Sequence, residues 1–235
     1  MDLQICHLGI MSYPKALAIQ ERLLQLRQQG VIGDILLLVE HEPVITLGKR
    51  GKTEHILVSS AWLAEHNIPV ITVNRGGDVT YHGPGQIVGY PIIDLRNHGR
   101  SIKHFVHNIE QVFINLLNKY YHIHAFRVPE YPGVWVEQGK ITAVGLTIKH
   151  WVSMHGFAFN VNTNLDHFKW IIPCGITSRP VCSLQSILGY KLAMDVVYQQ
   201  VATSFIEVFN YHPVMITQAQ LCEYLGRDND ASAQA

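Results

Sequence analysis

One cysteine stands in a setting that suits nucleophilic chemistry. Cys174 lies in the segment 172–176 (Ile-Pro-Cys-Gly-Ile), where a proline precedes it and a glycine follows it. Proline and glycine mark turns, and a turn presents a thiol to a substrate instead of burying it. Only a thiolate that the substrate can reach attacks an acyl group, so Cys174 is the candidate nucleophile. Cys6 and Cys222 lie in a predicted strand and a predicted helix, where the role of a small buried side chain fits better.

Lys140 is the candidate partner of this thiol. It opens the second strand of a predicted hairpin, directly after Gly139. On spacing alone, a solvated lysine beside a turn is the commoner interpretation. A desolvated lysine, however, has a lowered pKa and can exchange a proton with a thiol.

The segment 75–86 (Arg-Gly-Gly-Asp-Val-Thr-Tyr-His-Gly-Pro-Gly-Gln) places polar side chains among four glycines and a proline. Glycine lets the backbone approach a ligand closely. The segment matches neither the dinucleotide fingerprint nor the P-loop, and a predicted strand follows it, so no helix N-terminus is available for a phosphate. A long structural turn explains the spacing equally well, but so many polar residues in one loop favour a binding site.

His82, within this segment, is one of 14 histidines and carries little information by itself. It could act as a general base, as a hydrogen-bond donor to an oxyanion, or as a residue that orients another. A metal site is not expected, because His122 and His124 have no cysteine or carboxylate at ligand spacing.

The elements that must position these residues follow from the hydrophobic pattern. Helices are predicted at 14–30, 101–118, 195–209 and 217–225, where apolar residues recur every three or four positions. Strands are predicted at 34–40, 44–47, 70–73, 87–95, 133–136, 140–148 and 156–161. Most strands follow one another directly, which predicts an α+β fold with helices packed on a mixed or antiparallel sheet.

The overall composition narrows the class of protein. The chain has 235 residues, so we expect one domain over residues 1–226 and a polar, disordered tail over residues 227–235. Eighteen basic and 18 acidic residues leave no basic excess, so nucleic acid is not the expected partner. No apolar run reaches the ~18 residues of a membrane helix, and the first residues lack the pattern of a signal peptide. The four cysteines form no CxxC pair, and we expect reduced thiols in a cytoplasmic protein.

Four segments, in this order and spacing, resemble the lipoyl(octanoyl) transferases. They are 75–86, 139–145 (Gly-Lys-Ile-Thr-Ala-Val-Gly), 155–162 (His-Gly-Phe-Ala-Phe-Asn-Val-Asn) and 173–176 (Pro-Cys-Gly-Ile). The segment 46–51 (Thr-Leu-Gly-Lys-Arg-Gly) resembles an earlier block of the family, and the C-terminal helices add little. Each segment alone is moderately specific, and the four together are strongly so. The chain departs from the family at Cys182, where a hydroxyl residue is commoner, and at Phe159, where leucine is common.

The resemblance implies a reaction. The family transfers an octanoyl group from acyl carrier protein to a lysine of lipoyl domains, in 2-oxoacid dehydrogenase complexes and in the glycine cleavage H protein. This is the first step in making protein-bound lipoate. The resemblance also implies the fold of the biotin and lipoate ligases, a monomer, no cofactor and no metal.

The resemblance implies roles for individual residues as well. Cys174 would carry the acyl thioester, and Lys140 would lower the pKa of its thiol. The implied substrate-binding residues are Arg75, Gly76, Gly77, Asp78, Val79, Thr80, Tyr81, His82, Ala143, Val144, Gly145, Gly156, Phe157 and Ala158.

Three other functions remain open from the residues. A lipoate–protein ligase on the same fold would activate a free acid with ATP and would not need Cys174. A thiol hydrolase would pair Cys174 with His82 and use water as the acceptor. A non-catalytic acyl-binding module would bind the chain without forming a covalent bond.

Overall fold

The computed structural model describes residues 1–173 and 179–226, and within them eight strands form one large mixed sheet. In chain order these are β1 (Asp2–Met11), β2 (Asp34–His41), β6 (Gln86–Ile92), β7 (Phe126–Val128), β8 (Tyr131–Val136), β9 (Gly139–Lys149), β10 (Val152–Asn160) and β11 (His212–Met215). Their spatial order is β11-β1-β2-β6-β10-β9-β8-β7. The pairings of β1 with β2 and with β11 are parallel, and the others are antiparallel.

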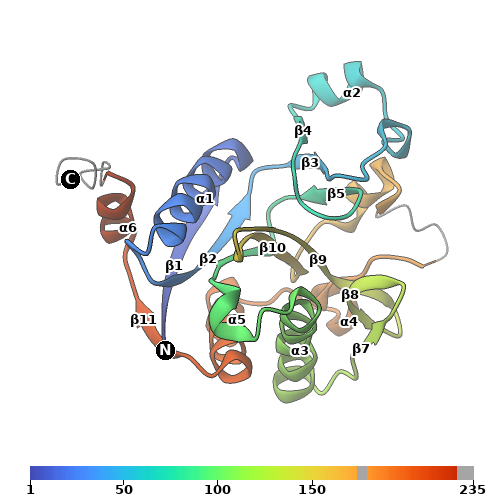
Figure 1. Cartoon of the computed structure of the whole chain (residues 1–235). Helices are drawn as coiled ribbons and strands as arrows, with labels where there is room; N and C mark the ends of the chain where they lie inside the picture. Colours follow the sequence, from blue (N-terminus) through green and yellow to red (C-terminus); the bar gives the residue numbers. More distant parts are fainter. Residues whose placement is uncertain (174–178, 227–235) are drawn as a thin grey trace.

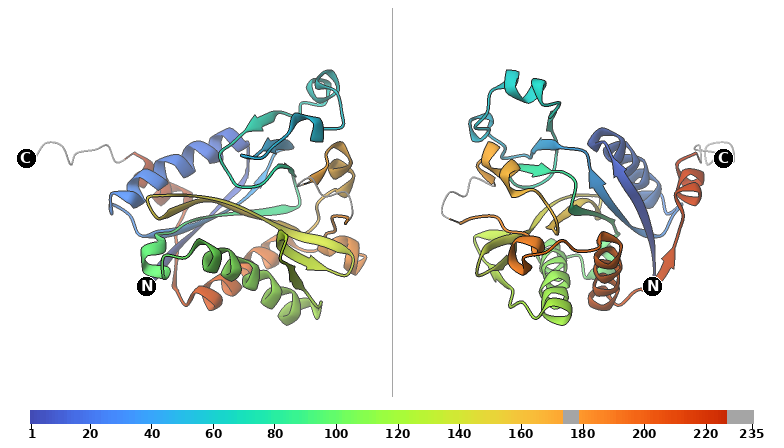
Figure 2. Two further views of the ribbon diagram at one scale, coloured as in Figure 1. Left: turned by 45° about the vertical axis from the view of Figure 1, so that its right-hand side comes forward. Right: turned by 180° about the vertical axis from the view of Figure 1, so that it is seen from behind.

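A second, smaller sheet has the order β4-β3-β5. Its strands are β3 (Val44–Leu47), β4 (Val70–Thr72) and β5 (Val79–His82). It carries the short helix α2 (Ser60–Glu65), whose N-cap Ser59 accepts a hydrogen bond from the backbone of Trp62. Tyr13, at the start of helix α1 (Tyr13–Gln28), packs with Val44 and Val73 of this part of the chain. The small sheet and α1 therefore lie together over one face of the large sheet (Figures 1 and 2).

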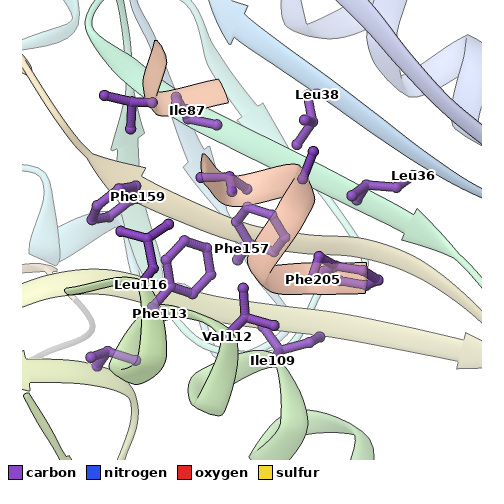
Figure 3. Packing of buried hydrophobic residues seen from close by; sticks show 14 of the residues in the cluster. Leu36, Leu38, Ile87, Ile109, Val112, Phe113, Leu116, Phe157, Phe159 and Phe205 are labelled. Carbon is purple, nitrogen blue, oxygen red and sulfur yellow. The ribbon is translucent and has the colours of Figure 1, made fainter. Parts of the chain in front are cut away.

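The opposite face of the large sheet is covered by helices α3 (Ile102–Tyr121) and α5 (Met194–Phe209), which pack on each other (Figure 1). The N-cap Ser101 accepts a hydrogen bond from the backbone of His104, as its predicted role requires. Figure 3 shows Phe113 of α3 between Phe157 and Phe159 of β10, with ring centroids 4.8 and 5.0 Å away. Burying such a side chain stabilises the fold by about 1.5–3 kcal/mol.

The remaining elements are short. Helix α6 (Gln218–Leu225) packs against α1 and β1, and helix α4 (Leu184–Leu188) begins after its N-cap Ser183. Three short 3₁₀ helices are the remaining elements: η1 (Thr53–His55), η2 (Leu95–His98) and η3 (Leu165–Trp170). No helix among residues 1–173 and 179–226 is long and apolar enough to span a bilayer.

The α+β class and the main helices are confirmed, and the strands differ from the prediction in several places, including β7 and β11, which were not predicted. Residues 2–11 form a long strand, and β10 begins four positions before the predicted start. The segment 75–86, predicted as a loop, contains strand β5, because the β-branched and aromatic run Val79-Thr80-Tyr81 pairs with β3. The expected polar tail, 227–235, lies outside the described residues.

The last strand of the large sheet joins the two ends of the chain. Strand β11 pairs in parallel with β1, with Asp2 opposite His212 and Ile5 opposite Met215. The backbone of His212 donates to the carbonyl of Met1 (2.9 Å). Strand β1 is therefore an inner strand, and β11 forms the edge of the sheet.

A buried ionic cluster ties α1, β2 and the residues after β6 together. Asp34 Oδ1 accepts from Arg27 Nε (2.8 Å) and from the backbone of Asp94 (3.0 Å). Its Oδ2 accepts from the hydroxyl of Tyr211 (2.6 Å). Burial raises the pKa of Asp34, but hydrogen bonds from His98, Tyr211, the Asp94 backbone and Arg27 outweigh it, so the pKa of this carboxyl is lowered.

We expect Asp34→Asn to lower the free energy of unfolding at pH 7 by roughly 3 kcal/mol, because Arg27 loses its closest buried partner. The folded-state pKa of Asp34 lies below the unfolded value, so its contribution is present at neutral pH and is lost as the pH falls below about 4. Urea titrations at pH 7 and in acid should therefore show a smaller acid-induced loss in the variant. Asp166→Asn, at an exposed ion pair with Lys169, is the control and should change little. An equal acid-induced loss in wild type and Asp34→Asn would contradict the assignment.

Candidate active site

The floor of a cavity is formed by small residues of β9 and β10. The antiparallel register places Ala143 opposite Ala158 and Gly145 opposite Gly156. Residues opposite each other in such a pair point to the same face of the sheet. Four neighbouring positions on one face therefore carry a methyl group or no side chain, and they leave a trough in the sheet. We call this cavity the trough.

The trough is closed by elements from both layers of the fold. It is lined by Tyr13, Arg75, Gly76, Gly77, Thr80, His82, Val88, Tyr90, Ala143, Val144, Gly145, His155, Gly156, Phe157 and Ala158. Strand β6 contributes one wall. Strand β5 and residues 75–77, which precede it, form the roof, and Tyr13 comes from the start of α1.

Glycine is required where the roof approaches the floor. The backbone of Gly76 donates to the carbonyl of Leu146 in β9 (2.9 Å). A Cβ on Gly145 would lie only 3.0 Å from the Gly76 carbonyl oxygen, and a Cβ on Gly156 would lie 2.1 Å from the carbonyl oxygen of Gly89. A larger residue at 156 would therefore displace backbone, and one at 145 would press against the backbone of the roof. The glycines set both the depth of the trough and the position of its roof.

Arg75 is held inside the roof. Its Nη2 donates to the carbonyl and to the hydroxyl of Thr46 (2.8 and 2.9 Å), and its Nη1 donates to the carbonyl of Gly76 (3.0 Å). The charge also reaches the neighbouring histidines. Burial, helped by this guanidinium, lowers the pKa of His155 to about 4. The site therefore holds one buried guanidinium beside a neutral imidazole at physiological pH.

A second cavity adjoins the trough. It is lined by Thr80, Gln86, Lys140, Ala143, Ala158, Asn160, Phe168, Pro173 and Val181. Thr80, Ala143 and Ala158 line both cavities. We call the second one the Lys140 cavity, and the shared residues place it at one end of the trough.

A β-bulge turns Lys140 towards this site. Gly133 of β8 pairs with Ala143, but Trp135, two residues on, pairs with Lys140, so β9 contains one extra residue. Without the bulge, positions 140 and 143 would point to opposite faces of the sheet. The extra residue, Ile141, is fully buried in the core beneath α3, while Lys140 shares the face of Ala143.

Lys140 is held in a narrow setting and is 7% exposed. Its Nζ lies 5.3 Å from the ring centroid of Trp135. Gly133 has a φ of 125°, and a Cβ there would lie 2.7 Å from Lys140 Cε. The backbone of Lys140 donates to the carbonyl of Pro180 (2.9 Å) and accepts from Cys182 (3.0 Å). The lysine is therefore fixed by both its side chain and its backbone.

The candidate nucleophile, Cys174, lies outside the described residues. The residue before it, Pro173, lines the Lys140 cavity. Further along the chain, Pro180 and Cys182 are hydrogen-bonded to the backbone of Lys140. The described chain thus meets Lys140 on both sides of residues 174–178.

A chain of side-chain hydrogen bonds determines the proton position on His82. Asn160 Nδ2 donates to the carbonyl of Cys182 (3.1 Å), so its Oδ1 accepts from Gln86 Nε2 (2.9 Å). Gln86 Oε1 in turn accepts from Nδ1 of His82 (2.8 Å). Burial first, and then the nearby His41, Arg75 and His155, lower the pKa of His82 to about 3. His82 is therefore neutral with its proton on Nδ1, and Nε2 can accept a hydrogen bond but cannot donate one.

His41 and two tyrosines form a second polar group beside the trough, which the sequence pattern did not indicate. His41 Nδ1 donates to the carbonyl of Met11 (3.0 Å), so its Nε2 accepts from the hydroxyl of Tyr90 (2.6 Å). The ring of Tyr13 lies 5.1 Å from that of His41. Burial lowers the pKa of His41 to about 4. The only sequence signal for this group was the alternation along β6, which places Tyr90 on the same face of the sheet as Val88.

Most of the expected substrate-binding residues line the trough, but Asp78, Val79 and Tyr81 do not. Alternation along β5 sends Thr80 and His82 to the trough and Val79 and Tyr81 to the core of the small sheet. The Tyr81 hydroxyl is hydrogen-bonded to His167 Nδ1 (2.6 Å).

Asp78 stabilises the roof from its outer side. Its carboxylate accepts from the backbone of Lys52 (3.0 Å) and from Nδ1 of His55. The carbonyl of His55 accepts from the backbone of Ile172 (2.8 Å). Asp78 thus connects the roof of the trough, through His55, to the chain that leads to Cys174.

Comparison with known proteins relates this geometry to characterised families. The model of the lipoyl protein ligase A/B catalytic domain matches residues 12–206. The octanoyltransferase of Desulforamulus reducens is 52% identical over 228 residues, covering 97% of this chain and 100% of that protein. The octanoyltransferase of Caldicellulosiruptor saccharolyticus is 52% identical over 226 residues and covers 96% of each chain.

Solved structures show the same fold at low sequence identity. A lipoate-protein ligase A bound with ATP superimposes with a TM-score of 0.75 at 16% identity, over 97% of this chain and 96% of that one. A putative lipoate protein ligase from T. acidophilum with bound lipoic acid gives a TM-score of 0.74 at 16% identity, over 96% of this chain and 93% of that one.

We expect Gly133→Ala to lower the free energy of unfolding by roughly 3 kcal/mol. The added Cβ would meet the Thr142 carbonyl oxygen at 2.3 Å and Lys140 Cε at 2.7 Å, at a φ that L-residues rarely adopt. Gly99→Ala is the matched control: its φ is also positive, at 77°, but nothing lies within 4 Å, so it should cost only about 1 kcal/mol. Urea denaturation measures both. Equal losses would show that the packing of Gly133 against Lys140 is not tight.

Proposed function

Because this chain belongs to the lipoyl protein ligase A/B catalytic-domain family and is an acyltransferase that moves octanoyl groups in protein lipoylation, we propose that it works through a thioester on Cys174. In this proposal the donor is octanoyl-loaded acyl carrier protein. The acceptors are lysines of lipoyl domains, in 2-oxoacid dehydrogenase complexes and in the glycine cleavage H protein. We further propose that residues 1–226 act as a single catalytic domain, as a monomer in the cytoplasm.

The observation that carries this proposal is the position of Lys140 relative to the chain around Cys174. Pro173 lines the same cavity as Lys140, and the backbone of Lys140 is bonded to Pro180 and Cys182. Cys174 is one residue from Pro173 and six from Pro180, so the chain between them is short enough for its thiol to reach the end of the lysine side chain. A neutral lysine beside a thiol can take its proton, and the ammonium that results stabilises the thiolate, which is the attacking form.

The first half-reaction exchanges one thioester for another. Lys140 accepts the proton of Cys174, and the thiolate attacks the octanoyl carbonyl of the donor. The carbon–sulfur bond to the carrier breaks, and the carrier thiolate leaves with the proton from Lys140. The two thioesters are similar in energy, so positioning and stabilisation of the oxyanion account for the acceleration.

The trough holds the alkyl chain during both half-reactions. It begins at the Lys140 cavity and is floored by small residues, so a chain can lie along β9 and β10. Burial of the octanoyl methylenes would contribute on the order of 5 kcal/mol, at ~0.8 kcal/mol each. Part of this is offset by the entropy lost when the chain is ordered.

The second half-reaction makes an amide. A lipoyl-domain lysine enters as the neutral amine, attacks the acyl-enzyme and loses a proton to Lys140, while Cys174 leaves as the thiolate. Amide formation from a thioester is downhill, so the proposed reaction needs no ATP.

A lipoate–protein ligase is the alternative on the same fold. The structural match to ligases is at 16% identity and therefore shows the fold alone. The 52% identity to octanoyltransferases over nearly the whole chain favours the transferase.

Intact-protein mass spectrometry after mixing with octanoyl-loaded carrier protein, without ATP, tests the intermediate. We expect an octanoyl adduct that hydroxylamine removes and that added lipoyl domain discharges. Cys174→Ala should show no adduct, whereas Cys182→Ala, at a buried thiol whose pKa burial raises to about 12, should still form it. Transfer that appears only with ATP and free octanoate would establish the ligase instead.

The role of Lys140 is tested by the rate of adduct formation in single-turnover experiments. Lys140→Ala should slow acylation by about 10²–10⁴-fold, because the proton acceptor is lost. Lys140→Arg should be similarly slow, since a guanidinium keeps the charge but does not accept a proton. If His82→Ala abolishes acylation and Lys140→Ala leaves it intact, the assignment of Lys140 as the base is wrong and His82 takes that role.

A further inference from the structure

The trough has a closed end that lies away from Lys140. Two residues beyond Gly156 on the same face, β10 carries Met154, which pairs with Thr147 of β9. Met154 is fully buried and Thr147 is 6% exposed, with its hydroxyl bonded to the carbonyl of Asn74. The row of small residues is therefore followed by a filled row, and the trough ends between the two.

Tyr90 stands at the last open level of the trough. The register of β6 and β10 pairs Gly89 with Phe157 and Val88 with Ala158, so Tyr90 lies beside Gly156. At the level nearer Lys140 the wall is thus a valine, and at the far level it is an aromatic ring. The width of the trough decreases at the position where Tyr90 stands.

The polar end of Tyr90 is turned away from the trough. Its hydroxyl donates to Nε2 of His41, whose Nδ1 donates to the carbonyl of Met11. Tyr13, which also lines the trough, lies against His41, with ring centroids 5.1 Å apart. The part of Tyr90 left to line the trough is its ring, and two hydrogen bonds behind it fix that ring in place.

We propose that Tyr90, held by His41, is the residue that limits the length of the acyl chain. This rests on the proposed function, in which the trough holds that chain. From Asn160, which lines the Lys140 cavity, to Gly156 is four residues of β10, or about 13 Å at ~3.3 Å per residue. This is comparable with an extended octanoyl group and its thioester. An acyl chain longer than octanoyl meets the ring of Tyr90, and a shorter acyl chain leaves the far level of the trough empty.

The test compares kcat/KM for hexanoyl-, octanoyl-, decanoyl- and dodecanoyl-loaded acyl carrier protein in wild type, Tyr90→Leu and Tyr90→Phe. Each methylene that gains room contributes about fourfold, so Tyr90→Leu should raise the decanoyl-to-octanoyl ratio about tenfold. Tyr90→Phe keeps the ring and loses only the hydrogen bond to His41. Its ratio should stay within about twofold of wild type, whatever its absolute rate.

A second variant acts from the floor of the trough, so that the test does not depend on the folding of Tyr90→Leu alone. In Gly145→Ala the added methyl group enters the far level of the trough, 3.0 Å from the Gly76 carbonyl oxygen and 3.5 Å from Arg75 Cδ. It should lower the octanoyl-to-hexanoyl ratio at least fourfold.

The outcomes separate this inference from the proposed function. Wild-type protein that transfers no acyl group from the carrier contradicts the proposed function. Wild-type protein that prefers octanoyl, with ratios unchanged in both Tyr90→Leu and Gly145→Ala, overturns the role of Tyr90 and leaves the function in place.

Discussion

The register of β9 against β10 is the constraint on which the site depends. It brings Ala143 and Gly145 beside Ala158 and Gly156. This pairing leaves one face of the sheet without large side chains at these four positions, where the trough lies. A slip by one residue would turn Phe157 and Phe159 into the trough and remove them from the core beneath α3. Core packing and the shape of the cavity are thus set by the same choice of pairing.

The bulge at Ile141 resolves a conflict between the core and the site. A regular strand would have to place either a lysine in the core or an apolar residue beside the trough. One extra residue lets Ile141 stay in the core while Lys140 turns to the site. The backbone of Lys140 then pairs with Pro180 and Cys182, so the chain that follows Cys174 takes its position from the lysine itself. The placement of Lys140 and the placement of residues 180–182 are therefore parts of one arrangement.

The sequence predicted those features that local pattern determines. The apolar spacing of α3 and its Ser101 cap were sufficient for that helix, and the resemblance of four segments identified most residues of the trough. Contacts between residues far apart in the sequence could not be predicted from local pattern. His41 is one of 14 histidines, and its importance depends on the contact with Tyr90, 49 residues away.

Two other features had no simple sequence signal. Strand β5 was not predicted, because glycines flank it on both sides. The alternation of side chains along a strand, which separates Thr80 and His82 from Val79 and Tyr81, could therefore not be predicted either. The bulge reverses the parity between positions 140 and 143, and nothing in the local sequence marks it. Neighbouring residues within one motif thus take different roles for reasons that only the three-dimensional pairing supplies.

The pairing of β1 with β11 has a consequence for how the protein is made. Strand β1 is ten residues long, and its outer edge stays uncovered until residues 212–215 have left the ribosome. An open edge of that length is a template for pairing with another chain. Strand β11 covers residues 2–5 of this edge with a strand of four residues that includes Pro213, which has no N–H to offer. The last strand thus shortens the open edge once the chain is complete, and a chain that stops before it would leave the whole outer edge of β1 open to pairing with another chain.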